Sequence, residues 1–222
     1  MWDRSRHVAG MRFSLSLFQP CERILVVGGN SRKVGKTALL VDILRVFPAS
    51  GRVAVKISSH SHGECPLNGP SCACGPEEHP FSFREEGDPA GTGDTSRFLA
   101  AGAERAILLG VKEGRLARAL PALGEMLAGA NRVLFESNTI SLFLSEACYL
   151  AVLDARKLDF KSSLQATLPL VDAFVLRSPL ATRHWPRTCV EAVKERPQFL
   201  YPGGSPFPVI LQSLIRKRFV PV

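Results

Sequence analysis

Residues 22–47 read ERILVVGGNSRKVGKTALLVDILRVF, and this stretch decides the fold. A run of β-branched and aliphatic residues ends in Gly28 and Gly29, and from Lys36 onward apolar residues recur at helical spacing. The first run predicts a buried strand over 22–29, and the second predicts a helix over 36–47. The segment between them closes with Gly-Lys-Thr, so the sequence predicts a strand, a phosphate-binding loop and a helix in that order.

The chemistry of phosphate binding explains the residue types in this loop. Glycines let backbone N–H groups turn toward phosphate oxygens, and the helix N-terminus adds a partial positive charge. We expect Lys36 to reach the terminal phosphates and the hydroxyl of Thr37 to bind Mg²⁺. The sequence therefore predicts a nucleoside triphosphate site made by Gly29, Asn30, Ser31, Arg32, Lys33, Val34, Gly35, Lys36, Thr37 and Ala38.

One position departs from the usual G-x-x-x-x-G-K-[ST] pattern. Asn30 stands where the first glycine is expected, so the loop is one residue longer between Gly29 and Gly35. This longer form, with Val34 before the second glycine, resembles the loop of the dethiobiotin synthetase and cobyrinic acid amidotransferase group. The resemblance leaves open an ATP-dependent ligase that activates a carboxylate as an acyl phosphate.

Strands and helices alternate along the rest of the chain. Apolar runs predict strands over 52–57, 105–111, 132–137, 149–153 and 173–176. Helical periodicity predicts helices from Asp94, the expected N-cap, and over 115–127, 161–168 and 209–217. Repeated β-α alternation implies helices on both faces of a parallel sheet. The predicted fold is thus an α/β, P-loop NTPase three-layer sandwich with a mostly parallel sheet.

We expect three parts in the chain: a disordered extension over 1–20, the P-loop NTPase domain over 21–178, and a basic extension over 179–222 packed on that domain. Within the domain, residues 58–93 form a polar, Cys-rich insert that is longer than ordinary connections. From Arg177 onward, eight Lys and Arg face two Glu, which accounts for most of the net charge of +8. We interpret these charges as a solvated basic surface, in preference to a site for nucleic acid, an acidic partner or an anionic cofactor.

The sequence predicts a cytoplasmic protein with no membrane segment. No apolar run reaches the roughly 18 residues of a membrane-spanning helix, and the N-terminal stretch lacks a long apolar core. In that compartment the six cysteines are not expected to form a disulfide framework.

Further motifs follow the loop in the order found in the molybdopterin-guanine dinucleotide biosynthesis protein B family. The strand Val53–Ile57 runs into His60-Ser61-His62, similar to the family's V-A-V-I-K-H-x-H-H. The stretch 93–97 (GDTSR), followed by Ala-Gly-Ala at 101–103, resembles the family's G-K-D-[ST]-x-R and A-G-A. The strand over 132–136 ends in Glu136, where the family has V-E-G. The resemblance covers residues 22–137 well and is weaker up to residue 176.

This resemblance implies a GTP- and Mg²⁺-binding accessory factor of molybdenum cofactor biosynthesis with slow GTP hydrolysis. It also implies a homodimer that assists a molybdopterin guanylyltransferase or a molybdoenzyme client. A guanine-reading Asn-Lys-x-Asp is absent, because the strand over 173–176 is followed by Arg177-Ser178. The choice between GTP and ATP therefore stays open.

Two carboxylates are candidates for handling Mg²⁺ and water beside Lys36. Glu136 follows an aliphatic strand and is expected at the carboxyl edge of the sheet, where open α/β folds bind ligands. Asp94 lies where a mobile loop meets a helix, and it is equally typical of a helix cap. We predict catalytic roles for Lys36, Glu136 and Asp94, with Thr37 and Glu136 holding Mg²⁺.

The insert carries a second candidate site. Cys65, Cys72 and Cys74 fall within ten residues, and with His62 they could hold Zn²⁺ or an iron–sulfur cluster. His60 and His79 are further ligands within reach. Reduced thiols in a flexible loop are the alternative, as are thiols that receive a metal transiently, which would suit a nucleotide-gated metal chaperone.

Overall fold

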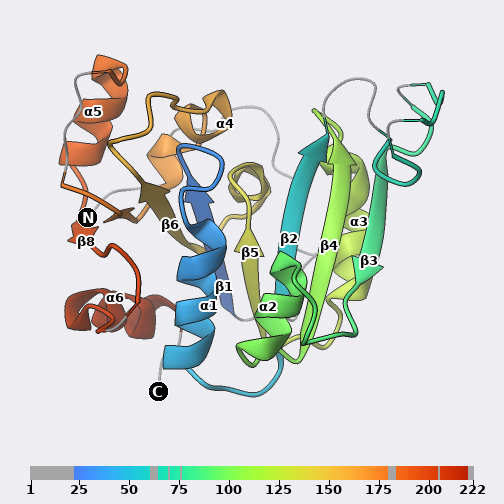
Figure 1. Ribbon diagram of the computed structural model, residues 1–222, viewed down its shortest axis with the longest axis horizontal. Helices are drawn as coiled ribbons and strands as arrows, with labels where there is room; N and C mark the ends of the chain where they lie inside the picture. Colours follow the sequence, from blue (N-terminus) through green and yellow to red (C-terminus); the bar gives the residue numbers. More distant parts are fainter. Residues whose placement is uncertain are drawn as a thin grey trace.

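The computed structural model describes residues 23–60, 65–69, 71–75, 77–179, 184–204 and 206–219. The predicted extension over 1–20 lies outside these residues. In the described part, strands and helices alternate for most of the chain (Figure 1). The strands are β1 Arg23–Gly29, β2 Arg52–His60, β3 Phe81–Glu85, β4 Arg105–Lys112, β5 Arg132–Glu136, β6 Cys148–Leu153, β7 Ala173–Leu176 and β8 Gln198–Leu200. The helices are α1 Lys36–Val46, α2 Asp94–Ala100, α3 Leu116–Met126, η3 Thr139–Phe143, α4 Ser162–Gln165, η4 Leu168–Leu170, α5 Arg187–Lys194 and α6 Val209–Phe219, where η marks a 3-10 helix.

The eight strands of the described chain form one sheet in the order β3-β4-β2-β5-β1-β6-β7-β8. All neighbours pair in parallel except β3, which runs antiparallel to β4 at one edge. The central strand β1 lies between β5 and β6, so the ends of these three strands meet at one place on the carboxyl edge. The predicted α/β class, with a mostly parallel sheet, is confirmed.

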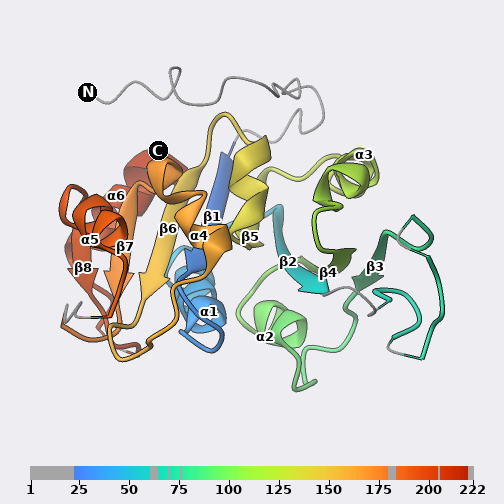
Figure 2. The same ribbon diagram turned by 90° about the horizontal axis from the view of Figure 1, so that it is seen from above.

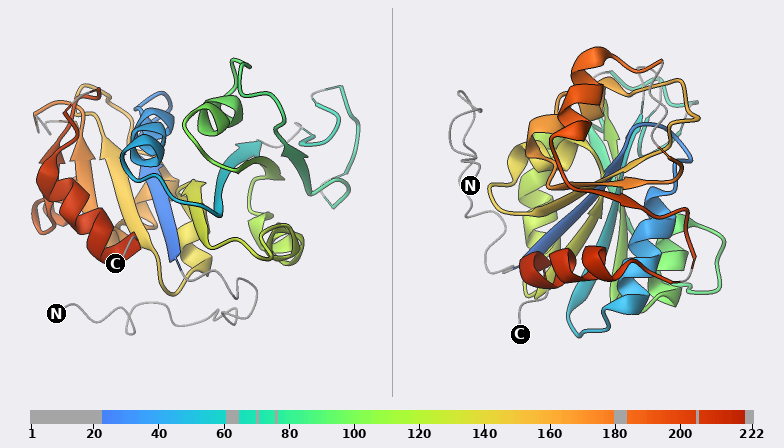
Figure 3. Two further views of the ribbon diagram at one scale, coloured as in Figure 1. Left: turned by 90° about the horizontal axis from the view of Figure 1, so that it is seen from below. Right: turned by 90° about the vertical axis from the view of Figure 1, so that its left-hand side faces the viewer.

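Helices cover both faces of the sheet, and each strand sends alternate side chains to the two faces. In β1, Leu25 and Val27 belong to the apolar core that includes residues of α1, α2 and α6, whereas Val26 belongs to the core that includes residues of α3 and α5. Figure 2 shows α1 and α2 on one side of the sheet and α3 on the other, and Figure 3 shows α2 and α3 on opposite sides from below. Strands buried on both faces read as continuous apolar runs, which is why β1 and β6 could be recognised.

The structure adds two features to the expected organisation of the chain. The insert over 58–93 contains regular structure, because β2 continues to His60 and β3 pairs with β4. Residues beyond 179 do not only pack on the domain, since α5 leads into β8, and β8 extends the same sheet beside β7. Strand β8 has only three residues and follows Pro197, which left no recognisable pattern. No helix in the described part of the chain is long and apolar enough to cross a membrane.

Candidate functional site

The loop between β1 and α1 lies at the carboxyl edge of the sheet, at the top of Figure 1. Gly35, with φ of +97°, turns the chain directly into α1, a conformation that residues with a side chain rarely adopt. No side chain of the described residues caps the N-terminus of α1, and its first turn contains no acidic residue. The first N–H groups of α1 thus remain available to an anion.

Two of the predicted loop residues anchor the loop. Asn30 is fully buried, and its amide accepts a hydrogen bond from the backbone N–H of Asp154 at 3.2 Å and donates to the carbonyl of Asp159 at 3.3 Å. Val34 is buried in the core against α1. The Asn that replaces the usual glycine therefore ties the loop to the end of β6.

Asn138, after β5, holds the start of the loop from the other side. Its Oδ1 accepts a hydrogen bond from the N–H of Gly29 at 2.8 Å, and its Nδ2 donates to the carbonyl of Gly29 at 3.1 Å and to Ser163 Oγ at 3.0 Å. A Cβ on Gly28 would lie 2.5 Å from both Asn138 Oδ1 and the Tyr149 hydroxyl. This close packing requires Gly28 and fixes where β1 ends.

Lys36 and Thr37 open α1 and face the predicted carboxylate. Thr37 Oγ1 donates a hydrogen bond to Glu136 Oε2 at 2.7 Å, and Lys36 Nζ donates to the carbonyl of Ser31 at 3.1 Å. Burial lowers the pKa of Lys36, although the charge of Glu136 opposes this effect. Glu136 is itself buried at the end of β5. The two strand ends bring together a lysine, a hydroxyl and a carboxylate that are far apart in sequence.

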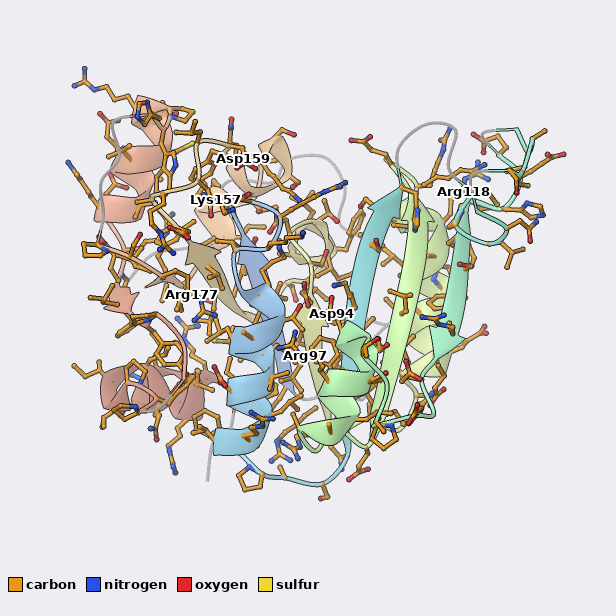
Figure 4. The ribbon with its side chains drawn as sticks, viewed as in Figure 1. Asp94, Arg97, Arg118, Lys157, Asp159 and Arg177 are labelled. Atoms are coloured by element: carbon orange, nitrogen blue, oxygen red, sulfur yellow. The ribbon has the colours of Figure 1, made fainter. Side chains whose placement is uncertain are left out.

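Asp94 joins this group through Lys56. Lys56 Nζ forms an ion pair with Asp94 Oδ2 and lies 3.6 Å from Glu136 Oε1. Burial raises the pKa of Asp94, but Lys56, with smaller contributions from Thr37 and Arg97, outweighs burial, so the pKa of Asp94 is lowered overall. Figure 4 places Asp94 and Arg97 on the side of α2 toward α1. The expected N-cap role of Asp94 is wrong, because Gly93 is the N-cap and the Asp94 carboxylate turns to Lys56 instead.

Arg177, directly after β7, supports the loop from a third strand end. Its guanidinium donates to the carbonyl of Gly35 at 2.6 Å and to the carbonyl of Tyr201 at 3.1 Å, and it lies over the Tyr201 ring. Figure 4 shows Arg177 beside α1. Burial lowers the pKa of Arg177. This cation holds the residue that precedes Lys36 rather than pointing at a ligand.

Asp154, after β6, accepts hydrogen bonds from neighbouring side chains. Its carboxylate accepts hydrogen bonds from Arg156 Nε at 2.9 Å and from Ser178 Oγ at 3.1 Å. The hydrogen bond from Arg156 has the largest effect on this carboxylate, and together these hydrogen bonds lower the pKa of Asp154 to about 2. The ends of β6 and β7 are thereby joined beside the loop.

The outer side of the loop is positively charged. Arg32 and Lys33 are exposed, and Lys161 is close enough to Arg32 that this charge, after burial, lowers the pKa of Lys161. Together with Lys36 these side chains form a basic surface at the mouth of the loop. Such a surface suits a polyanionic ligand.

The predicted thiol ligands meet beside β3 and β4, and strands β2 and β5 separate them from β1 and its loop. Ligand atoms of Cys65, Cys72, Cys74 and His79 all lie within 4.8 Å of one another. Burial raises the pKa of Cys65, but backbone N–H groups of residues 67 and 68 and the other two thiols lower it to about 6. His62, the predicted fourth ligand, lies outside the described residues, and His79 occupies the fourth position of the cluster.

The predicted residues thus form two separate groups. The loop over 29–38 meets Glu136 and Asp94 at one place, and the three cysteines gather at another. Sequence reasoning missed Lys56, Asn138 and Arg177 as parts of the first group. Comparison with protein-family models, with curated proteins and with solved structures gives no match for this chain.

Proposed function

We propose that this protein is a P-loop nucleotide-binding protein that binds a nucleoside triphosphate with Mg²⁺ between β1, α1 and β5. The observation that carries the proposal is the hydrogen bond of 2.7 Å between Thr37 Oγ1 and Glu136 Oε2. In phosphoryl-transfer sites a loop hydroxyl and a strand-end carboxylate share the task of holding Mg²⁺. These two groups come from segments 99 residues apart, and both are at the carboxyl edge of adjacent strands.

The phosphate groups would bind to the loop backbone and to the uncapped N-terminus of α1. Lys36 is suited to the terminal phosphates because it is half-buried at the loop, its ammonium donates to the carbonyl of Ser31, and desolvation lowers its pKa. A phosphate anion beside Lys36 would favour its charged form. Arg32, Lys33 and Lys161 would add attraction at longer range.

Thr37 and Glu136 are the residues that would hold Mg²⁺, either directly or through its water molecules. When bound, the ion would neutralise charge on the phosphate oxygens. Lys56 presently supplies a positive charge beside Glu136 and Asp94. Asp94 is the first residue of α2 and pairs with Lys56. A change of charge next to Lys56 would therefore alter the electrostatic energy of the first turn of that helix.

The resemblance to the molybdopterin-guanine dinucleotide biosynthesis protein B family supports GTP as the nucleotide. It further supports slow hydrolysis and an accessory role in molybdenum cofactor biosynthesis, with a molybdopterin guanylyltransferase or a molybdoenzyme as partner. The residues that carry this part of the proposal are 53–57, 93–97 and Glu136. Of these, Glu136 and Asp94 also belong to the site around the loop.

Titration with fluorescent GTP and ATP analogues, with and without Mg²⁺, tests the proposal. We expect saturable, Mg²⁺-strengthened binding to the wild type and its loss in Lys36→Ala. Lys194→Ala is the matched control, because it removes an exposed lysine on α5 at a distance from the loop. Failure of both nucleotides to bind with Mg²⁺ would reject the proposal, and preference for ATP would reject its GTP part.

A further inference from the structure

We infer that Cys65, Cys72, Cys74 and His79 bind a single structural Zn²⁺ ion, a site separate from and independent of the proposed nucleotide function. A tetrahedral ion with bonds of about 2.3 Å to sulfur and about 2.1 Å to nitrogen separates these ligand atoms by about 3.6 Å. The Sγ atoms of Cys65 and Cys72 lie 3.6 and 3.9 Å from His79 Nδ1. The side chains are thus already arranged as the ligands of one ion.

The compactness of the cluster favours one ion over an iron–sulfur cluster. All four ligand atoms lie within 4.8 Å of one another. Tetrahedral bonds of about 2.0–2.3 Å to one central ion hold ligand atoms about 3.3–3.8 Å apart, so a small contraction of the cluster would suit a single ion. An iron–sulfur cluster would place a body of several iron and sulfide atoms among its ligands and hold them farther apart. Three thiolates with one imidazole are also a donor set that structural zinc sites use.

Residues around the cluster already serve as an outer shell. The backbone N–H of Asn68 donates to Cys65 Sγ at 3.3 Å, and Asn68 Nδ2 donates to Cys72 Sγ at 3.7 Å. Lys112 Nζ donates to Cys74 Sγ at 3.2 Å and to the carbonyls of Gly75 and Glu78 at 2.6 and 2.7 Å. Because Zn²⁺ with three thiolates carries one net negative charge, the ammonium of Lys112 compensates it where the metal is bound.

The ion would replace a hydrophobic core for the segment over 65–79. In its described residues this segment has one isolated bridge, between Cys65 and Gly69, and its largest apolar side chain, Leu67, is exposed. So little apolar burial cannot offset the loss of chain entropy on ordering, whereas metal binding can. Four protein ligands leave no open coordination position, so the site is structural rather than catalytic.

The position of the ligands shows what the ion would stabilise. His79 precedes β3 by two residues, and Lys112 is the last residue of β4. The N–H of Lys112 also donates to the carbonyl of Pro80 at 2.9 Å. Zinc would therefore fix the antiparallel edge strand β3 to the end of β4, which strands β2 and β5 separate from β1 and the loop over 29–38.

Metal content and cobalt spectroscopy on the full chain provide the test. We expect one zinc per chain in protein purified under reducing conditions, and on replacement by Co²⁺ we expect thiolate charge-transfer bands with tetrahedral visible bands. Absence of bound metal together with a failure to take up Zn²⁺ or Co²⁺ would overturn the inference. So would a stoichiometric iron content with the absorption of an iron–sulfur cluster.

Histidine variants decide the ligand set. His79→Ala is expected to weaken Zn²⁺ binding by more than the roughly 10–100-fold that loss of an outer-shell partner costs. His62→Ala and His60→Ala, which remove the neighbouring histidines of the insert, are expected to retain the cobalt spectrum. Metal loss in His62→Ala with retention in His79→Ala would overturn the assignment.

Lys112 is tested as a positioning residue. Lys112→Met is expected to lower Zn²⁺ affinity by about 10–100-fold and to shift the cobalt charge-transfer bands, and Lys112→Arg is expected to restore both. Chelation of the wild-type protein offers a readout that needs no variant: protease cleavage within 65–79 should rise on chelation and fall when Zn²⁺ is returned. Cleavage that ignores the metal would contradict a structural role.

Discussion

The side-chain amide of Asn138 pairs with both backbone polar groups of Gly29, accepting from the N–H at 2.8 Å and donating to the carbonyl at 3.1 Å. A side chain thereby takes the place that a neighbouring strand would hold at the end of β1. The same amide donates to Ser163, so it links the loop to α4. Correct placement of the loop thus depends on a residue 109 positions away.

Asn138→Ala should destabilise the protein and weaken nucleotide binding together. Loss of the amide leaves the N–H of Gly29 without its partner, and such a group costs about 1–3 kcal/mol of unfolding free energy. Urea denaturation and nucleotide titration measure the two effects. Asn131→Ala is the control, because Asn131 is exposed and its substitution should stay within about 0.5 kcal/mol. Equal stability of the two variants would contradict the assigned role of Asn138.

Glu136→Gln should reduce the Mg²⁺ dependence of nucleotide binding while the fold is retained. The amide is isosteric and can still accept from Thr37, but the negative charge that would attract Mg²⁺ is lost. If Glu136 acts on the ion through water, we expect a loss of about 10–100-fold in Mg²⁺ affinity. Nucleotide titrations at a series of Mg²⁺ concentrations measure this change. An unchanged Mg²⁺ dependence would remove Glu136 from the proposed site.

Gly35→Ala should destabilise the protein more than Gly129→Ala. Both glycines have positive φ, +97° and +80°, so a side chain at either incurs about 1–2 kcal/mol of backbone strain. A Cβ at Gly35 would also lie 2.7 Å from Arg177 Nε, whereas a Cβ at Gly129 would meet nothing within 4 Å. Crowding should therefore add about 1–3 kcal/mol at Gly35 alone. Thermal or urea unfolding of the two variants gives the comparison, and equal losses would show that Arg177 moves aside freely.

Asp154→Asn should lower the free energy of unfolding near neutral pH. In acid the variant and the wild type should become equally stable. Because the pKa of Asp154 is lowered to about 2, its stabilising contribution is fully present above its ordinary pKa of about 3.9 and disappears as the pH falls through about 2. The difference in unfolding free energy between wild type and variant should thus shrink between about pH 4 and pH 2. Asp159→Asn, at an exposed acid near the same loop, controls for removal of a charge. A difference that stays constant over this range would contradict the ion pair with Arg156.

Periodicity in the sequence predicted the central strands, because strands buried on both faces are continuous apolar runs. It also predicted α1, α2, α3 and α6, but not α5. Strand β3 was missed because its five residues, FSFRE, contain only two apolar side chains. Its place in the sheet is decided by pairing with β4. Strand β8 was missed because three residues carry no period at all. These edge strands depend on tertiary contacts rather than on local pattern.

The candidate site was predictable where a motif fixes residue types, as at Lys36, Thr37 and Glu136. Lys56 could have been found, because period-two alternation places it on the same face as its register partner Glu136. Asn138 and Arg177 act on loop backbone over 109 and 142 residues, and no local pattern signals such bonds. His79 could not be chosen over His62 from spacing, because the antiparallel pairing of β3 with β4 places His79 beside the three cysteines.

The short strand β8 has a consequence for self-association. An exposed sheet edge can add strands from a second molecule, and very short edge strands and prolines prevent this. Strand β8 offers only three residues and lies between Pro197 and Pro202, which lack backbone N–H groups. At this end of the sheet, growth into an aggregate by strand addition is blocked.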